Sequence, residues 1–172
     1  MNVLLGVTGS IAAKLTPKLE MALVDDGHDV QTVFTQSAAK FTYSVRKLYV
    51  DEDEWRYYDN ENRVLHIDLV KWADVLVIAP CTANTLSKIS NGICDNLLTC
   101  CVRAWSVKQH LVIVPAMNTQ MFTHPVMREH AQMVTSRGAI WIPPQTKELF
   151  CGDTGIGAMA EIDVIIKRLK EL

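Results

Sequence analysis

The stretch His110-Leu111-Val112-Ile113-Val114-Pro115-Ala116-Met117-Asn118 decides the fold. Its apolar first part predicts a buried parallel strand, because such strands consist almost entirely of Val, Ile and Leu. The carboxyl end of such a strand opens onto the ligand crevice of an α/β sheet. We therefore expect the Asn118 amide to lie at a strand end, where it can donate a hydrogen bond to a carboxylate. Alternatively, this is a plain strand-to-helix loop in which Asn118 is a helix N-cap.

Apolar, strand-like runs alternate with helical patterns on both sides of this stretch. We predict strands at residues 2–7, 29–35, 48–50, 74–79, 111–114 and 139–142. We predict helices at residues 12–26, 66–73, 83–90, 94–105, 125–136 and 158–172, a further helix early in the mixed segment 37–50, and loops at 51–62 and 145–157. This alternation implies βαβ units. The sequence therefore predicts a single α/β domain over residues 1–172, with a doubly wound parallel sheet in three α/β/α layers.

The composition is that of a globular protein. The chain has 172 residues, of which 49% are hydrophobic and 21% charged, and its formal net charge is −2. That length suits one domain with a substantial core. The charge gives no overall basic field for nucleic acid. The longest apolar runs are under about ten residues, too short to span a bilayer, so we expect no membrane partner.

The five cysteines are odd in number and include no Cys-x-x-Cys pair: Cys81, Cys94, Cys100, Cys101 and Cys151. This pattern favours free thiols in a reducing compartment and argues against a structural zinc site. We therefore expect a cytoplasmic protein without a bound metal. Cys94, Cys100 and Cys101 fall in an apolar helical stretch and are expected to be small core residues.

Three polar clusters follow predicted strands. They are Thr8-Gly9-Ser10-Ile11, Thr35-Gln36-Ser37 and Pro80-Cys81-Thr82-Ala83-Asn84-Thr85. A helix begins after each, and a helix N-terminus favours an anion. The first cluster is not Gly-x-Gly-x-x-Gly, so a mononucleotide phosphate suits it better than a dinucleotide. Three such clusters side by side could bind flavin mononucleotide (FMN) through its phosphate, ribityl chain and ring edge. Each cluster alone is also compatible with an ordinary N-cap turn.

Two further residues could carry proton chemistry. His66 opens a predicted helix, whose N-terminus favours a neutral imidazole that can act as a base. The alternative is an ordinary surface or capping histidine. Cys151 lies in a glycine-rich run, where a thiol could donate a proton when the loop closes over a site. The alternative is a flexible connection before the last helix.

Several of these segments together resemble the flavin-containing cysteine decarboxylase family. The resemblance rests on Gly9-Ser10-Ile11-Ala12-Ala13, Leu65-His66-Ile67, Cys151-Gly152-Asp153 and residues 72–80, 82–86, 94–100, 115–118 and 157–161. It implies a Rossmann-like sheet and a homotrimer with FMN bound near subunit contacts. It also implies decarboxylation of 4′-phosphopantothenoylcysteine to 4′-phosphopantetheine in coenzyme A biosynthesis. In the family, FMN takes a hydride from the cysteine β-carbon to give a thioaldehyde. Loss of carbon dioxide then gives an enethiolate, which is protonated and takes the hydride back.

The resemblance also assigns roles to individual residues. It implies that His66 is the base, that Asn118 holds the substrate carboxylate and that Cys151 is the acid of the reductive half. Met121 lines the substrate pocket, and Lys147 is a candidate for contacting the substrate phosphate. The positions that match FMN contacts are Gly9, Ser10, Ile11, Thr35, Ser37, Thr82, Ala83, Asn84, Thr85 and Ala116.

Two departures from the family pattern and three alternative functions remain. The motif usually ends in Met-Trp, whereas here it ends in Met121-Phe122, and the residues before Cys151 differ from those of related enzymes.

A peptidyl-cysteine oxidative decarboxylase stops at the enethiol and would not need Cys151. A flavin prenyltransferase shares the fold without the pairing of Asn118 with Cys151. A phosphatase-binding regulatory relative would be expected to lack part of the catalytic set.

Overall fold

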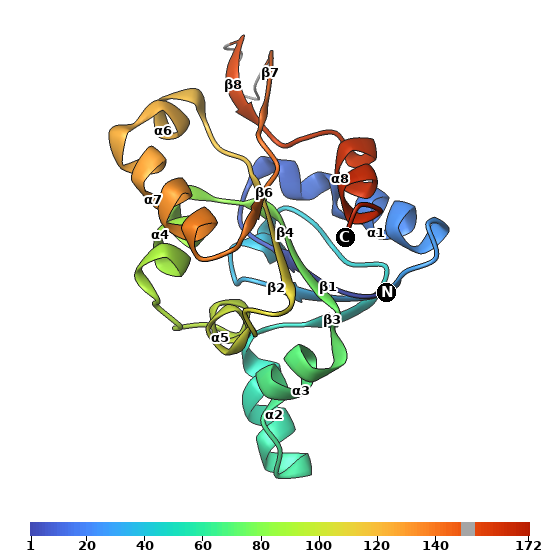
Figure 1. Cartoon of the computed structure of the whole chain (residues 1–172). Helices are drawn as coiled ribbons and strands as arrows, with labels where there is room; N and C mark the ends of the chain where they lie inside the picture. The colour runs from blue at the N-terminus through green and yellow to red at the C-terminus, as the bar shows by residue number, and fades with distance from the viewer. Residues whose placement is uncertain (149–153) are drawn as a thin grey trace.

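A six-stranded parallel sheet forms the centre of the molecule in the computed structural model, which describes residues 1–148 and 154–172 (Figure 1). Its strands follow the order β3-β2-β1-β4-β5-β6. They are β1 (Asn2–Val7), β2 (Asp29–Phe34), β3 (Lys47–Tyr49), β4 (Val75–Cys81), β5 (His110–Pro115) and β6 (Ile140–Trp141). Each neighbouring pair is parallel, as the alternation of strands and helices predicts.

Helices connect these strands, and a separate two-stranded antiparallel hairpin follows β6. The helices are α1 (Thr16–Asp25), α2 (Asp51–Glu61), α3 (Leu65–Trp72), α4 (Ala83–Asn91), α5 (Leu97–Ala104), α6 (Thr119–Thr123), α7 (Pro125–Ser136) and α8 (Ile162–Leu169). Two short 3-10 helices are Ile11–Leu15 and Ala38–Lys40. The hairpin consists of β7 (Gln145–Glu148) and β8 (Thr154–Ala158). No helix in the described part of the chain is long and apolar enough to cross a membrane.

Both faces of the sheet are buried, which gives the predicted three α/β/α layers. Successive side chains of a strand point to opposite faces, and β4 is buried along its whole length. Val75 and Val77 belong to a cluster with apolar residues of α1 and α8. Leu76 and Ile78 belong to a second cluster with residues of α3, α4, α5 and α7. Figure 1 shows α1 and α8 on one side of the sheet and α4, α5 and α7 on the other.

The prediction of a loop at residues 51–62 is wrong, because this segment forms α2. Four acidic residues occupy its first turn, where they interact favourably with the helix dipole. Asp53 Oδ2 also accepts the Val50 N–H at 2.8 Å. The helix ends at Asn62, whose φ of 49° is left-handed. No residue of α2 is buried, so it has no apolar stripe by which the sequence could reveal it.

Other boundaries also differ from the sequence expectation. The predicted loop 145–157 contains the β7–β8 hairpin, and the last helix begins at Ile162 rather than at residue 158. The segment 37–50 holds only a 3-10 turn before β3, and the short helix α6 was not predicted. Cys101 is buried as expected, but Cys94 is exposed and Cys100 only half-buried. The reason is that α5 begins at Leu97, which leaves Cys94 in the preceding loop.

Candidate active site

Four polar loops lie side by side at the carboxyl ends of β2, β1, β4 and β5. The sheet order makes these four strands neighbours, and all of them run in the same direction. The three clusters at residues 8–11, 35–37 and 80–85 and the loop at 115–118 are therefore adjacent, as the sequence predicts. This edge of an α/β sheet is where ligands bind.

Hydrogen bonds join these loops to one another. Thr8 Oγ1 donates to the Pro80 carbonyl at 2.8 Å and accepts the Thr82 N–H at 2.9 Å. The Thr35 N–H donates to the Val7 carbonyl at 3.0 Å. The Ala116 N–H donates to the Cys81 carbonyl at 3.0 Å. The backbone at the strand ends is thus held in one arrangement before any ligand binds.

Gly9 and Ser37 bring the first two loops into close approach. A Cβ atom added at Gly9 would lie 2.3 Å from Ser37 Oγ and 2.5 Å from Ser37 Cβ. Ser37 Oγ is also 3.3 Å from Thr35 Oγ1. Only glycine fits at position 9 without displacing these hydroxyls, so the glycine keeps two polar side chains beside the turn after β1.

A cavity of about 450 Å³ opens between the first cluster, the loop after β5 and the hairpin. It is lined by Ser10, Ile11, Ala12, Lys14, Leu15, Ala116, Met117, Asn118, Lys147, Glu148, Gly157, Ala158 and Met159. The Met117 N–H donates to the Gly157 carbonyl at 2.9 Å, which fixes β8 against the loop after β5. The cavity is within the size range of small-molecule sites and combines apolar walls with a few polar groups.

Asn118 is the N-cap of α6. Its Oδ1 accepts the Gln120 N–H at 2.8 Å. The capping interpretation of the sequence is therefore confirmed. The cap also holds the Asn118 amide at the wall of the cavity, so capping and ligand binding are compatible roles for one side chain.

Lys147 brings a positive charge to the same cavity from β7. Its Nζ lies 3.3 Å from Glu161 Oε1, and both side chains are exposed. Two hydrogen bonds lower the pKa of Glu161. The larger effect comes from Gln145 and the smaller from Lys147. An exposed ion pair of this kind is weak, so Lys147 can exchange its partner for another anion.

A family model described as Flavoprotein matches residues 1–172. The chain belongs to the flavoprotein family. It is 45% identical to mouse phosphopantothenoylcysteine decarboxylase over 174 residues, which cover 98% of this chain and 85% of that protein. A solved PPC decarboxylase mutant with a cysteine-to-serine substitution, complexed with pantothenoylaminoethenethiol, superposes with a TM-score of 0.94 at 42% identity, covering 99% and 96% of the two chains. The FMN-binding protein AtHal3 gives a TM-score of 0.91 at 43% identity, covering 99% and 95%.

The flavoprotein cavity gathers only some of the predicted site residues. Those that line it are Ser10, Ile11, Ala116, Asn118 and Lys147. Gly9, Thr35 and Ser37 lie in the adjoining loops. Residues 83–85 form the first turn of α4, which Thr82 caps by accepting the Thr85 N–H. Met121 is 50% exposed and does not line the cavity. Cys151 lies outside the described residues.

Burial raises the pKa of Cys81 to about 12, so this thiol stays protonated at neutral pH.

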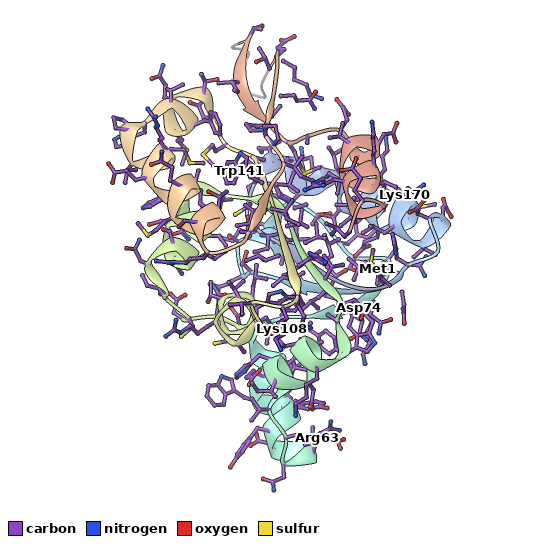
Figure 2. All side chains as sticks on the ribbon, viewed as in Figure 1. Met1, Arg63, Asp74, Lys108, Trp141 and Lys170 are labelled. Carbon is purple, nitrogen blue, oxygen red and sulfur yellow. The ribbon has the colours of Figure 1, made fainter. Side chains whose placement is uncertain are left out.

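His66 of this flavoprotein is not part of the cavity. It lies on α3, which together with α2 forms the lower end of the molecule in Figure 1, whereas the hairpin forms the upper end. Figure 2 labels Arg63, just before α3, at that lower end. His66 instead contacts Glu54, whose Oε1 lies 2.8 Å from His66 Nδ1. The sequence alone does not point to Glu54, because its partner is twelve residues away and the pair depends on how α2 packs on α3.

Proposed function

We propose that this flavoprotein is an FMN-dependent phosphopantothenoylcysteine decarboxylase. It converts 4′-phosphopantothenoylcysteine to 4′-phosphopantetheine and carbon dioxide in coenzyme A biosynthesis. The observation that carries the proposal is the cavity that brings the Ser10 turn, the Asn118 amide and the Lys147 ammonium together. The identity with mouse phosphopantothenoylcysteine decarboxylase over nearly the whole chain supports it.

The residues at the strand ends fit FMN. Hydroxyls that suit a phosphate and a polyol gather there, and Gly9 lets the Ser37 hydroxyl lie against the turn after β1, where a Cβ atom would displace it. The residues proposed to hold FMN are Gly9, Ser10, Ile11, Thr35, Ser37, Thr82, Ala83, Asn84, Thr85 and Ala116. Bound FMN supplies a hydride acceptor that later returns the hydride, which permits decarboxylation without net oxidation. AtHal3, an FMN-binding protein with the same fold at 43% identity, supports this assignment.

The substrate is proposed to bind through its two anionic groups. Asn118, held by its cap on α6, binds the carboxylate with its amide. Lys147 leaves Glu161 and binds the phosphate, which carries more charge than one carboxylate. Met121 covers the substrate from α6, which joins the Asn118 loop. These contacts place the cysteine end beside the strand ends and the phosphate beside the hairpin.

Two residues are proposed to move protons. His66 accepts a proton at its imidazole ring when the substrate is oxidised. Cys151 donates its thiol proton to carbon once carbon dioxide has left. The solved relative that carries a cysteine-to-serine substitution is complexed with pantothenoylaminoethenethiol. An enethiol is the species expected to persist when that protonation fails, which supports the role of Cys151.

The separation of His66 from the cavity leads us to propose a homotrimer in which one subunit supplies His66 to the cavity of the next. Large apolar side chains are exposed near α3: Trp55 by 71% and Tyr58 by 54%. Such side chains suit a subunit contact.

The four described cysteines are free, which supports a cytoplasmic location.

Subunit sharing can be tested by complementation. Purified His66→Ala and Asn118→Asp variants, each inactive alone, are dissociated, mixed and reassembled. A shared site predicts recovered activity in the mixture, because some cavities then combine an intact His66 with an intact Asn118. No recovery in mixed trimers, verified by native mass spectrometry, would contradict the sharing of residues between subunits.

The first experiment on function is a visible spectrum of the purified protein, followed by product mass analysis after addition of 4′-phosphopantothenoylcysteine. A flavin spectrum and a product lighter by one carbon dioxide are expected. A product that has also lost two hydrogens would indicate the oxidative, enethiol-forming reaction. Absence of flavin would favour the regulatory alternative. In Cys151→Ser, carbon dioxide should still be released once per bound flavin under anaerobic conditions, while the flavin stays reduced and the saturated product fails to form.

A further inference from the structure

Glu54 places both of its carboxylate oxygens on one residue, His66. Oε2 accepts the backbone N–H of His66 at 3.0 Å, and Oε1 lies 2.8 Å from His66 Nδ1. We propose that Glu54 is a positioning residue that fixes the tautomer of His66, so that its Nε2 is the proton-accepting atom. The inference rests on the proposed function, in which His66 is the base.

The hydrogen-bonding capacities of the two side chains determine the tautomer. An ionised carboxylate has acceptors only, so whichever ring atom faces it must carry a hydrogen. A neutral imidazole carries one N–H, and Glu54 therefore holds it on Nδ1. The lone pair is then on Nε2, at the opposite side of the ring. This is the form in which a neutral histidine can accept a proton from a substrate.

The pair is held firmly by the helices that carry it. The side chains of His66 and Glu54 are only 24% and 19% exposed. One face of α2 carries three contacts at intervals of three residues. Asp51 Oδ1 accepts the Leu97 N–H of α5 at 2.8 Å, Glu54 contacts His66, and the Tyr57 hydroxyl donates to Asp68 Oδ2 of α3 at 2.9 Å. Polar contacts of this kind dock a helix with no buried residue, and they bring Glu54 to His66.

A purely structural role for Glu54 makes a different prediction. No side chain of the N-cap residue Val64 caps α3, so Glu54 supplies an acceptor for one of the unpaired N–H groups at the helix start. If capping were its whole role, a neutral side chain of the same shape would serve equally well. Glutamine provides that shape and separates the two roles.

The decisive variant is Glu54→Gln. Its single oxygen is needed by the His66 backbone N–H, so its NH₂ group faces Nδ1. Nδ1 must then become an acceptor, and the ring hydrogen moves to Nε2. We expect kcat to fall on the order of 100- to 10,000-fold, as when a neutral amide replaces the carboxylate that orients a catalytic histidine. KM and the flavin spectrum should change little, because neither depends on the tautomer.

The tautomer can be observed directly, without turnover. Holoenzyme with ¹⁵N-labelled histidine is measured by long-range ¹H–¹⁵N correlation, and loss of a signal in His66→Gln identifies His66. The expected result is an Nδ1–H tautomer in the unchanged protein and an Nε2–H tautomer in Glu54→Gln. Glu52→Gln, an exposed neighbour on α2, is the matched control and should keep both kcat and tautomer.

Specific results would overturn the inference. One is an Nε2–H tautomer of His66 in the unchanged protein. Another is a Glu54→Gln variant with normal kcat together with a Glu54→Ala variant that is unstable, which is the pattern of a helix cap. Failure of the proposed function is distinguishable, because unchanged protein would then fail to release carbon dioxide from 4′-phosphopantothenoylcysteine. The tautomer measurement would still decide what Glu54 does to His66.

Discussion

The Thr8 hydroxyl donates to the Pro80 carbonyl at 2.8 Å, across 72 residues of sequence. Thr8 is 1% exposed, and its oxygen also accepts the Thr82 N–H. The Thr8 backbone N–H also donates to the Pro80 carbonyl at 3.3 Å, so Thr8 fixes the loop after β4 relative to the loop after β1 through its backbone and its hydroxyl. Both loops are proposed to bind the same cofactor, so this bond should matter for affinity as well as for stability.

Thr8→Val should lower both quantities. Valine has nearly the same shape but leaves the half-buried Thr82 N–H without this acceptor, at a cost of about 1 kcal/mol in the free energy of unfolding. Urea unfolding measures that cost, and titration of the apoprotein with FMN measures affinity. Thr8→Ser keeps the hydroxyl and serves as the control. Equal FMN affinity in the Val and Ser variants would show that the bond does not organise the site.

Gly9→Ala should abolish or greatly weaken FMN binding. The new Cβ would lie 2.3 Å from Ser37 Oγ, so the loop after β2 must move away from the turn after β1. Gly27→Ala is a matched control at the amino end of β2. Its added Cβ meets no atom within 4 Å, but its φ of 84° is strained for alanine, at a cost of about 1 kcal/mol. The ratio of flavin to protein absorbance should therefore drop only in Gly9→Ala.

Asn118→Asp should lose substrate binding while it keeps the fold and the flavin. Aspartate is as good an N-cap as asparagine, so α6 should persist. Its charge repels the substrate carboxylate, and substrate affinity should fall. Asn118→Ala removes the cap as well and should lower stability by about 0.5–2 kcal/mol. Calorimetric titration of the flavin-loaded variants with substrate, combined with thermal unfolding, separates the two effects. Unchanged affinity in Asn118→Asp would contradict the carboxylate contact.

His28 should make the fold less stable in mild acid. Burial, and next the nearby N-terminal ammonium, lower the pKa of His28 below its ordinary value of 6.5. The unfolded chain therefore binds a proton more readily than the folded one. The contribution to stability is complete above pH 6.5 and is lost as the pH falls below that value toward the folded-state pKa. The free energy of unfolding, measured at several pH values between the folded-state pKa and pH 6.5, should rise with pH. His28→Gln should reduce that slope. An identical slope in both proteins would contradict this role.

The parallel sheet could be predicted because its strands are apolar on both faces. Val75, Leu76, Val77 and Ile78 are all fully buried, and such a run has few other interpretations. Helix α2 could not be predicted in this way, since none of its residues is buried and only Tyr57 packs against the core, beside polar contacts to α3 and α5. The β7–β8 hairpin was missed for a similar reason. Its residues are mostly exposed or half-buried rather than buried, and its glycines are typical of loops.

The same contrast holds for the candidate site, where the residues at strand ends could be predicted and those placed by the packing of distant segments could not. Ser10 and Asn118 were located because the carboxyl ends of neighbouring parallel strands converge, a rule that needs only the strand order. The place of Lys147 depends on the contact of the hairpin with the loop after β5, in which the Gly157 carbonyl accepts the Met117 N–H. The contact of Glu54 with His66 depends on the angle between two helices, and no local pattern in the sequence encodes it.

The short outer strands of the central sheet have a consequence for how copies of this chain can associate. β3 has three residues and β6 only two, so each edge of this sheet offers few unpaired backbone groups. Strand addition at a sheet edge is the usual first step toward fibres, and short edge strands suppress it. The edges of the central sheet are thus poor templates for strand addition by further copies of the chain, which disfavours open-ended polymerisation through this sheet.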